Sequence, residues 1–165
     1  MPETQLQVLI AEDEPLLAMD LEHVVVSAGH LVVGWATDRD SALMIAGAHA
    51  PNLAFVDMRL RDGDTGPEVA RRLSARGVSI VITTAHVEDA MKLEGVLGIV
   101  PKPCSSQTIR AVLRYAAQRL EGTEAPPPPG LLAATGAAPA ASARLKPPSV
   151  PSASPLPQPP LEPDK

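Results

Sequence analysis

The chain has 165 residues, 45% of them hydrophobic and 20% charged, which suits one folded domain of ordinary size with a modest appendage. A formal net charge of −5 gives no cationic field for a nucleic-acid backbone, and three aromatic residues are too few for a base-stacking surface. The single cysteine, Cys104, excludes an internal disulfide. No apolar run approaches the ~20 residues of a membrane helix, so we expect a cytoplasmic protein without direct nucleic-acid or membrane binding.

Short apolar runs rich in β-branched residues alternate with longer stretches of helical periodicity. The first expected helix begins at Pro15 and ends at Gly29, and the second begins after Asp38 and stops before Pro51. The expected strands are residues 6–11, 31–36, 53–56, 79–83 and 97–100.

The second half of the pattern continues this alternation. Pro67 opens a third helix, and Ser105 or Ser106 caps a last one that continues to Leu120. The segment 87–94 is short and weakly patterned, so it is the least regular helical stretch. Five strand–helix repeats with continuously apolar strands predict an α/β fold in which helices cover both faces of a parallel sheet.

The C-terminal part has a different composition. Thirteen of the 19 prolines lie in the last 45 residues. Such a segment cannot bury enough apolar surface to offset the entropy lost on ordering. We therefore expect the folded domain to span residues 1–120, followed by a Pro/Ala-rich disordered tail over residues 121–165.

Polar residues follow the predicted strands at their carboxyl ends, where open α/β sheets place ligand sites. Glu12 and Asp13 follow the first strand, Asp57 the third, Thr84 the fourth and Lys102 the fifth. In a flavodoxin-like sheet of order 2-1-3-4-5 the first and third strands are neighbours, so the carboxylates converge in one crevice.

Each of these residues alone is more often structural than functional, since an acidic pair at a strand end is usually a loop or a helix cap. Their coincidence at the ends of four strands favours a site. Three crowded carboxylates repel one another unless a hard cation such as Mg²⁺ lies among them. A carboxylate that faces a divalent ion, a hydroxyl and an ammonium suits phosphoryl transfer.

The motifs of these strand ends resemble the receiver domain of two-component response regulators. The resemblance covers about residues 5–120 and rests on residues 9–14 (LIAEDE), 56–60 (VDMRL), 82–85 (ITTA) and Lys102-Pro103. It implies a (βα)5 doubly wound fold with Asp57 as the phosphorylated residue. Catalytic roles fall to Asp57, Thr84 and Lys102, and Mg²⁺ is held by Glu12, Asp13, Asp57 and the main-chain carbonyl of Arg59.

The sequence also departs from the family pattern. Ile99 occupies a position where receivers often carry an aromatic switch residue, and only residues 85–101 separate Thr84 from Lys102, which implies a shortened fourth helix. His86 and Arg59 lie where the family tunes access of water to the phosphoryl group. The three other histidines, His23, His30 and His49, are expected on the surface.

The leading hypothesis is a stand-alone, single-domain response regulator. It takes a phosphoryl group from a histidine kinase or a histidine phosphotransfer protein, catalyses its own phosphorylation and dephosphorylation, and acts through an unknown downstream protein or by onward transfer. One alternative is a phosphorylation-independent adaptor with a vestigial pocket. Another is a haloacid-dehalogenase-like phosphatase, disfavoured because Arg59 stands where that family has a second aspartate.

Overall fold

A computed structural model describes residues 3–135 of the chain. They form a five-stranded parallel sheet in the order β2-β1-β3-β4-β5, as expected for the flavodoxin-like class. The strands are β1 (Gln7–Ala11), β2 (Leu31–Ala36), β3 (Leu53–Asp57), β4 (Ser79–Thr84) and β5 (Gly98–Pro101).

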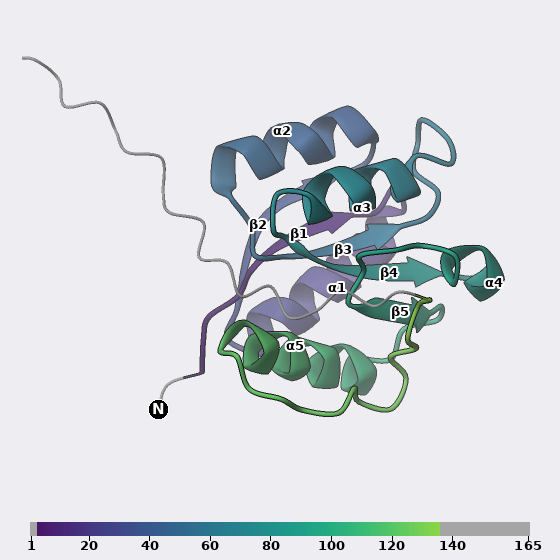
Figure 1. Ribbon diagram of the computed structural model, residues 1–165. Coiled ribbons are helices and arrows are strands. Elements are labelled where there is room, and N and C mark those ends of the chain that lie inside the picture. The colour runs from purple at the N-terminus through teal and green to yellow at the C-terminus, as the bar shows by residue number, and fades with distance from the viewer. Residues whose placement is uncertain (1–2, 136–165) are drawn as a thin grey trace, which may run out of the picture.

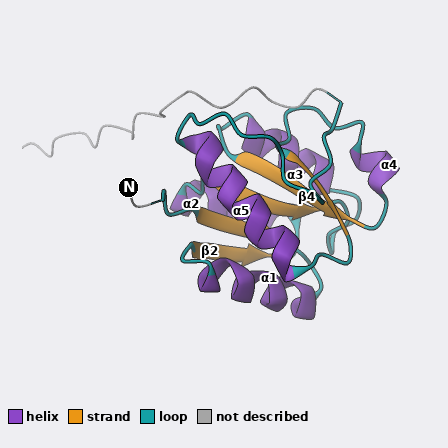
Figure 2. Cartoon of the chain, turned by 90° about the horizontal axis from the view of Figure 1, so that it is seen from below, coloured by secondary structure: helices purple, strands orange, loops and turns teal. Residues whose placement is uncertain are grey.

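Helices cover both faces of this sheet. They are α1 (Pro15–Ser27), α2 (Arg39–His49), α3 (Gly66–Ser74), α4 (Val87–Ala90) and α5 (Ser106–Leu120). Figure 1 shows α2 and α3 on one face and α1 and α5 on the other, and Figure 2 shows α1 and α5 crossing the second face. The four residues of α4 confirm the predicted shortened fourth helix.

The alternation of side chains along β3 explains why this strand is apolar throughout. Ala54 and Val56 pack into the core under α2 and α3, whereas Leu53 and Phe55 pack into the core under α1 and α5. All five residues of β3 are buried, including Asp57 at its end. The central strand therefore delivers a buried carboxylate to the carboxyl end of the sheet.

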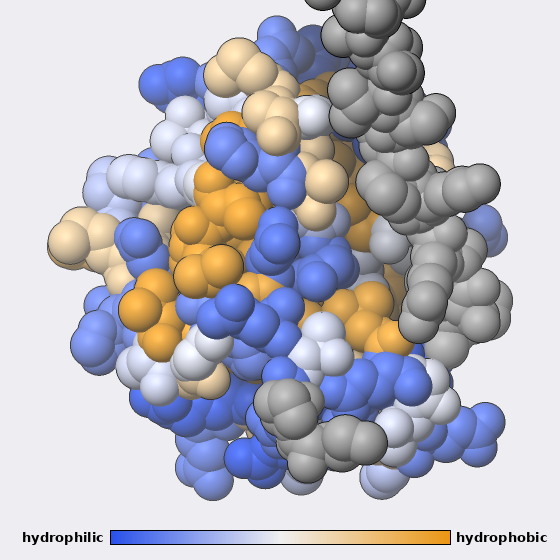
Figure 3. All heavy atoms as spheres, turned by 90° about the vertical axis from the view of Figure 1, so that its left-hand side faces the viewer, coloured by the Kyte–Doolittle hydropathy of each residue, from blue (hydrophilic) through white to orange (hydrophobic). Residues whose placement is uncertain are grey.

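The surface at the end of the sheet where the strands begin is mixed in character (Figure 3). Figure 3 faces the left-hand side of Figure 1, where the strands begin, and shows hydrophobic patches interrupted by hydrophilic side chains. The arrowheads of the strands point to the opposite end, where α4 also lies. In the part of the chain described here, no helix has the length and hydropathy needed to span a bilayer.

Two expectations differ from the structure. His30 is buried rather than on the surface, and its Nδ1 accepts a hydrogen bond from the Leu6 N–H at 3.2 Å, because the α1–β2 turn folds it against the start of β1. Residues 121–135 belong to the expected tail, yet Leu131 and Ala134 are buried, because this part of the chain pairs with the edge strand β5. The expected disorder of residues 136–165 concerns positions outside the described residues and stays a prediction.

Candidate functional site

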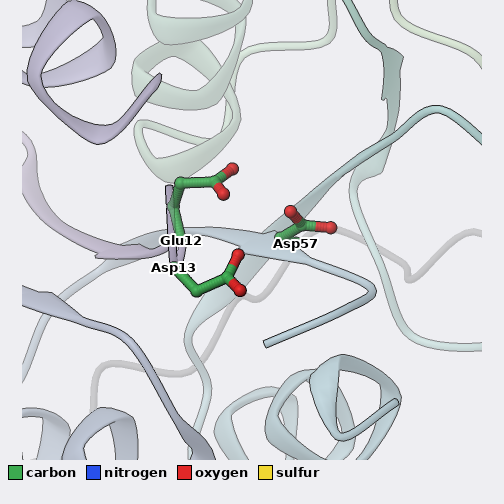
Figure 4. Close-up of side chains that lie close together, drawn as sticks. All are labelled: Glu12, Asp13 and Asp57. Atoms are coloured by element: carbon green, nitrogen blue, oxygen red, sulfur yellow. The ribbon is translucent and has the colours of Figure 1, made fainter. Parts of the chain in front are cut away.

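The carboxylates of Glu12, Asp13 and Asp57 meet at the carboxyl end of the sheet. One oxygen of each lies within 4.8 Å of the others. Figure 4 shows Glu12 and Asp13 on the segment that follows β1 and Asp57 at the end of β3. The neighbouring positions of β1 and β3 in the sheet bring them together.

Local hydrogen bonds orient these side chains. The Arg59 N–H donates to Asp57 Oδ1 at 3.1 Å, and the Glu14 N–H donates to Glu12 Oε1 at 3.1 Å. The indole N–H of Trp35 donates to the Glu12 carbonyl at 2.6 Å, which ties the loop after β1 to the end of β2. Two backbone N–H groups therefore orient the Asp57 and Glu12 carboxylates, and the Trp35 side chain fixes the loop that carries Glu12.

Lys102 brings a positive charge to the same place. Its Nζ donates to Asp57 Oδ2 at 2.5 Å and to Glu12 Oε2 at 2.9 Å. The backbone N–H of Lys102 donates to the Thr84 carbonyl at 2.9 Å, so the lysine is anchored to the end of β4. The Lys102–Pro103 peptide bond is cis.

The electrostatics of the cluster reflect burial. Glu12 is 4% exposed and Asp57 is 7% exposed. Burial raises the pKa of Glu12, and the charge of Asp57 raises it further, although the hydrogen bonds from Lys102 and Glu14 oppose this rise. Burial lowers the pKa of Lys102, but its hydrogen bonds to Asp57 and Glu12 outweigh that effect and the pKa is raised overall. One ammonium contacts two of the three carboxylates, so the negative charge of the cluster is only partly neutralised.

These donor atoms fit Mg²⁺ by their chemistry. Carboxylate oxygens are hard ligands, and Mg²⁺ commonly takes one or two carboxylates together with waters. Asp13 is the more accessible member of the cluster, while Glu12 and Asp57 are buried. The arrangement offers a divalent ion three carboxylate oxygens at one open side.

A cavity of about 690 Å³ opens beside the cluster. Thr84, Lys102, His86 and Arg59 line it together with Asp13 and Asp57. The structure thus brings Asp57, Thr84, Lys102, Asp13 and Arg59 to one opening, which His86 also lines. Glu12, the remaining predicted metal ligand, lines a second cavity of about 390 Å³ together with Lys102. Ile99 does not line the cavity and is fully buried in the core under α2 and α3.

Sequence reasoning missed further residues of this opening. Asp64 lines the cavity, and the Arg59 Nε pairs with its carboxylate at 3.1 Å. Asp89 lines it as well, from the short helix α4. The acidic composition of the 61–66 turn was the available signal for Asp64, but the turn carries no periodicity that would orient one side chain.

Gly66 explains how the β3–α3 loop comes so close to Asp57. A Cβ on Gly66 would lie 2.0 Å from the Asp57 carbonyl oxygen and 2.7 Å from the Met58 Cα. The Gly66 N–H donates to the Met58 carbonyl at 3.2 Å. A side chain at this position would push the loop off the end of β3, and glycine is therefore required by close backbone approach.

The fold and the acidic cluster at the carboxyl end of its sheet are those of a receiver domain of response regulators. The family model of the response regulator receiver domain matches residues 8–114. The chain therefore belongs to the response regulator receiver family.

Two curated relatives carry similar sequences. The chain is 35% identical over 114 residues to the phyllosphere-induced regulator PhyR of Methylorubrum extorquens, a match that covers 67% of this chain and 43% of the relative. It is 33% identical over 120 residues to the transcriptional regulatory protein PdtaR of Mycobacterium tuberculosis, covering 68% of this chain and 57% of the relative. The chain thus matches about half the length of these relatives.

Solved structures of PhyR proteins are also similar. The response regulator PhyR of Brucella abortus superposes with a TM-score of 0.66 at 31% identity, covering 73% of this chain and 51% of that one. The receiver domain of PhyR from Erythrobacter litoralis gives a TM-score of 0.64 at 30% identity, covering 74% of this chain and 95% of that one.

Proposed function

We propose that this receiver domain accepts a phosphoryl group on Asp57 from a phosphohistidine of a histidine kinase or a histidine phosphotransfer protein. The observation that carries the proposal is the convergence of Lys102 Nζ on the Glu12 and Asp57 carboxylates beside Asp13. This arrangement places a buried carboxylate next to a cation at the mouth of a cavity. The domain then signals through contacts with another protein or passes the group onward.

The chemical step follows from these groups. A carboxylate oxygen of Asp57 attacks the phosphorus, the phosphorus–nitrogen bond breaks, and the histidine nitrogen leaves with the bond's electron pair and takes up a proton. The product is an acyl phosphate on Asp57 and a neutral imidazole on the donor. Attack of water on the phosphorus later returns the free carboxylate and inorganic phosphate.

The other residues of the opening have assigned parts in this proposal. The Lys102 ammonium, released from part of its pairing with Asp57, donates to the phosphoryl oxygens, and the Thr84 hydroxyl donates to the same group. Glu12, Asp13, Asp57 and the Arg59 carbonyl are the proposed Mg²⁺ ligands. The ion supplies charge neutralisation on the phosphoryl oxygens. His86 and Arg59 at the rim control entry of water.

Ile99 carries no part of an aromatic relay in this proposal. It has no ring that could turn, and a β-branched side chain has few χ1 options. Its side chain is fully buried, which supports a packing role for Ile99. Thr84 is then the residue that reports the state of Asp57 to α4.

A small phosphorus–nitrogen donor tests the proposal without knowledge of the cognate kinase. The full chain is incubated with phosphoramidate and Mg²⁺, and ³¹P NMR monitors the protein-bound phosphate. We expect a Mg²⁺-dependent signal that hydroxylamine removes, as an acyl phosphate requires, and no signal with Asp57→Asn. A hydroxylamine-resistant phosphate, or equal labelling of Asp57→Asn, would contradict the proposal.

A further inference from the structure

The chain after α5 folds back onto the edge of the sheet. The Thr123 N–H donates to the Gln118 carbonyl at 2.9 Å as the chain leaves the helix. In Figure 1 the segment passes beneath α5 and rises to β5. A turn follows, in which the Leu131 N–H donates to the Pro128 carbonyl at 3.1 Å and Gly130 has φ +90°. Residues 130–135, which we name the strap, then run beside β5.

The strap pairs with β5 as an antiparallel partner. The Ile99 N–H donates to the Leu132 carbonyl at 2.9 Å, and the Leu132 N–H donates to the Ile99 carbonyl at 2.8 Å. β5 is the last strand in the sheet order, so the strap covers an edge that would otherwise offer unpaired backbone groups.

Side chains of the strap fit this edge closely. Leu131 is 6% exposed and lies over Gly98, where an added Cβ would be 2.6 Å from Leu131 Cδ1 and 2.9 Å from the Leu132 carbonyl oxygen. Ala134 is also buried, in the same core cluster as Ala90 of α4. The missing side chain of Gly98 is what makes room for the strap.

The strap is also joined to the candidate site through α4. The Thr135 N–H donates to the Met91 carbonyl at 3.1 Å, at the C-terminal end of this helix. At the N-terminal end the His86 N–H donates to Thr84 Oγ1 at 2.9 Å. Thr84 lines the cavity next to Asp57. A four-residue helix thus connects the hydroxyl at the site to the last residue of the strap.

We propose that the strap is a releasable strand that masks the β5 edge until Asp57 is modified. This inference rests on the proposed function. When Thr84 Oγ1 turns toward a phosphoryl group, the His86 N–H loses its acceptor and the short α4 shifts. The Met91 carbonyl then moves from Thr135, and the strap loosens. The exposed edge offers the Ile99 backbone groups and the space over Gly98 to an extended segment of a partner protein that carries a leucine opposite Gly98.

Coupling of this kind is reciprocal. If modification of Asp57 weakens the strap, weakening of the strap must favour the modified state to the same extent. Beryllofluoride with Mg²⁺ is a stable mimic of the phosphoryl group and serves as the probe. Leu131→Ala removes the side chain that fills the space over Gly98, whereas Leu132→Ala is the matched control, because Leu132 is 39% exposed and pairs through its backbone.

Amide hydrogen exchange of the full chain, followed residue by residue by NMR, tests the proposal. On addition of Mg²⁺ and beryllofluoride we expect exchange of the Ile99, Leu132 and Thr135 amides to rise several-fold. Protection near Asp57 without any rise at these three amides overturns the strap alone. Absence of any change near Asp57 overturns the proposed function and the strap with it.

The variants give a second, independent readout. Leu131→Ala is expected to raise exchange at Ile99 without the probe and to tighten beryllofluoride binding by about 5-fold or more, within the usual range of allosteric coupling. Gly98→Ala, which crowds the strap from the opposite side, should act in the same direction. Leu132→Ala should change neither quantity. Equal effects of Leu131→Ala and Leu132→Ala, or unchanged affinity in Leu131→Ala, overturn the proposal.

Discussion

The candidate site and the α2 cluster, which consists of Asp38, Ser41 and Arg61, each hold a carboxylate next to cationic and hydroxyl groups, yet the pKa values of Glu12 and Asp38 are shifted in opposite directions. At the candidate site, burial and the charge of Asp57 raise the pKa of Glu12. At the start of α2, hydrogen bonds from the Ser41 side chain and backbone and from Arg61 lower the pKa of Asp38 to about 2. Folding favours the ionised form of Asp38 at the α2 cluster, whereas it disfavours the ionised form of Glu12 at the candidate site.

The difference follows from what surrounds each carboxylate. Asp38 caps α2, accepting from the Ser41 N–H at 2.8 Å and from Arg61 Nη2 at 2.6 Å, and its side chain is 22% exposed. Glu12 is buried beside a second carboxylate and shares one ammonium with it. Ionisation of Asp38 therefore stabilises the folded state. At the candidate site the negative charge exceeds the positive charge, and this excess favours a bound cation.

The largest expected difference between the two clusters is in how their variants change the stabilisation of the domain by Mg²⁺. Binding of Mg²⁺ to the native state alone stabilises it by mass action, by about 2.7 kcal/mol when the ion is present at 100 times its Kd. Thermal melting with and without Mg²⁺ measures this. Asp13→Ala should abolish the dependence, and Asp38→Ala, the matched control at the α2 cluster, should retain it. A wild-type melting temperature that does not respond to Mg²⁺ would mean that the site holds no metal.

Removal of the cationic side chain from each cluster should change the free energy of unfolding by different amounts. Lys102→Ala leaves Glu12 and Asp57 without their shared ammonium, and we expect a loss on the order of 1–3 kcal/mol, below the ~3–5 kcal/mol of a fully buried broken pair because the lysine side chain is 17% exposed. Arg61→Ala removes a side chain that is 71% exposed and should change stability little. Chemical denaturation measures both, and equal losses would remove the distinction between the clusters.

Neutral substitutions should shift stability in opposite directions. Glu12→Gln removes a carboxylate whose raised pKa disfavours the charge in the folded state, so the melting temperature at neutral pH should rise slightly. Asp38→Asn removes a carboxylate whose ionised form is favoured, so the melting temperature should fall slightly.

The pH dependence carries the same sign difference. The stabilisation from Asp38 is present above its ordinary pKa of 3.8 and is lost as the pH falls toward about 2. Glu12 behaves in the opposite way, because protonation below its raised pKa relieves the cost of burying its charge. Melting curves between pH 2 and pH 7 for the wild type, Asp38→Asn and Glu12→Gln should show these two opposite dependences of stability on pH. A decrease in stability for Glu12→Gln at neutral pH would contradict this account of the site.

Much of the fold was predictable because its signals are local or repeat regularly. Apolar runs such as 53–56 and helix starts such as Pro15 and Asp38 agree with the structure within a few residues. The meeting of Glu12, Asp13 and Asp57 followed from strand order, since carboxyl ends of neighbouring parallel strands share one edge.

Features that depend on a distant partner were not predictable. The strap comes from a proline-rich segment whose composition favours coil, and burial of Leu131 needs the open space over Gly98, 33 positions earlier in the chain. His30 is buried, and its Nδ1 accepts a hydrogen bond from the Leu6 N–H. No local sequence pattern predicts this contact. The pairing of Lys102 with Glu12 as well as Asp57 is likewise a tertiary result.

Direct mapping of the phosphorylated residue tests the central claim that Asp57 is the acceptor. The full chain is treated with acetyl phosphate and Mg²⁺, the acyl phosphate is reduced with borohydride, which converts a phosphorylated aspartate to homoserine, and peptides are sequenced by mass spectrometry. We expect homoserine at position 57 of the wild type and none anywhere in Asp57→Asn. Homoserine at position 13, or labelling that persists in Asp57→Asn, would contradict it.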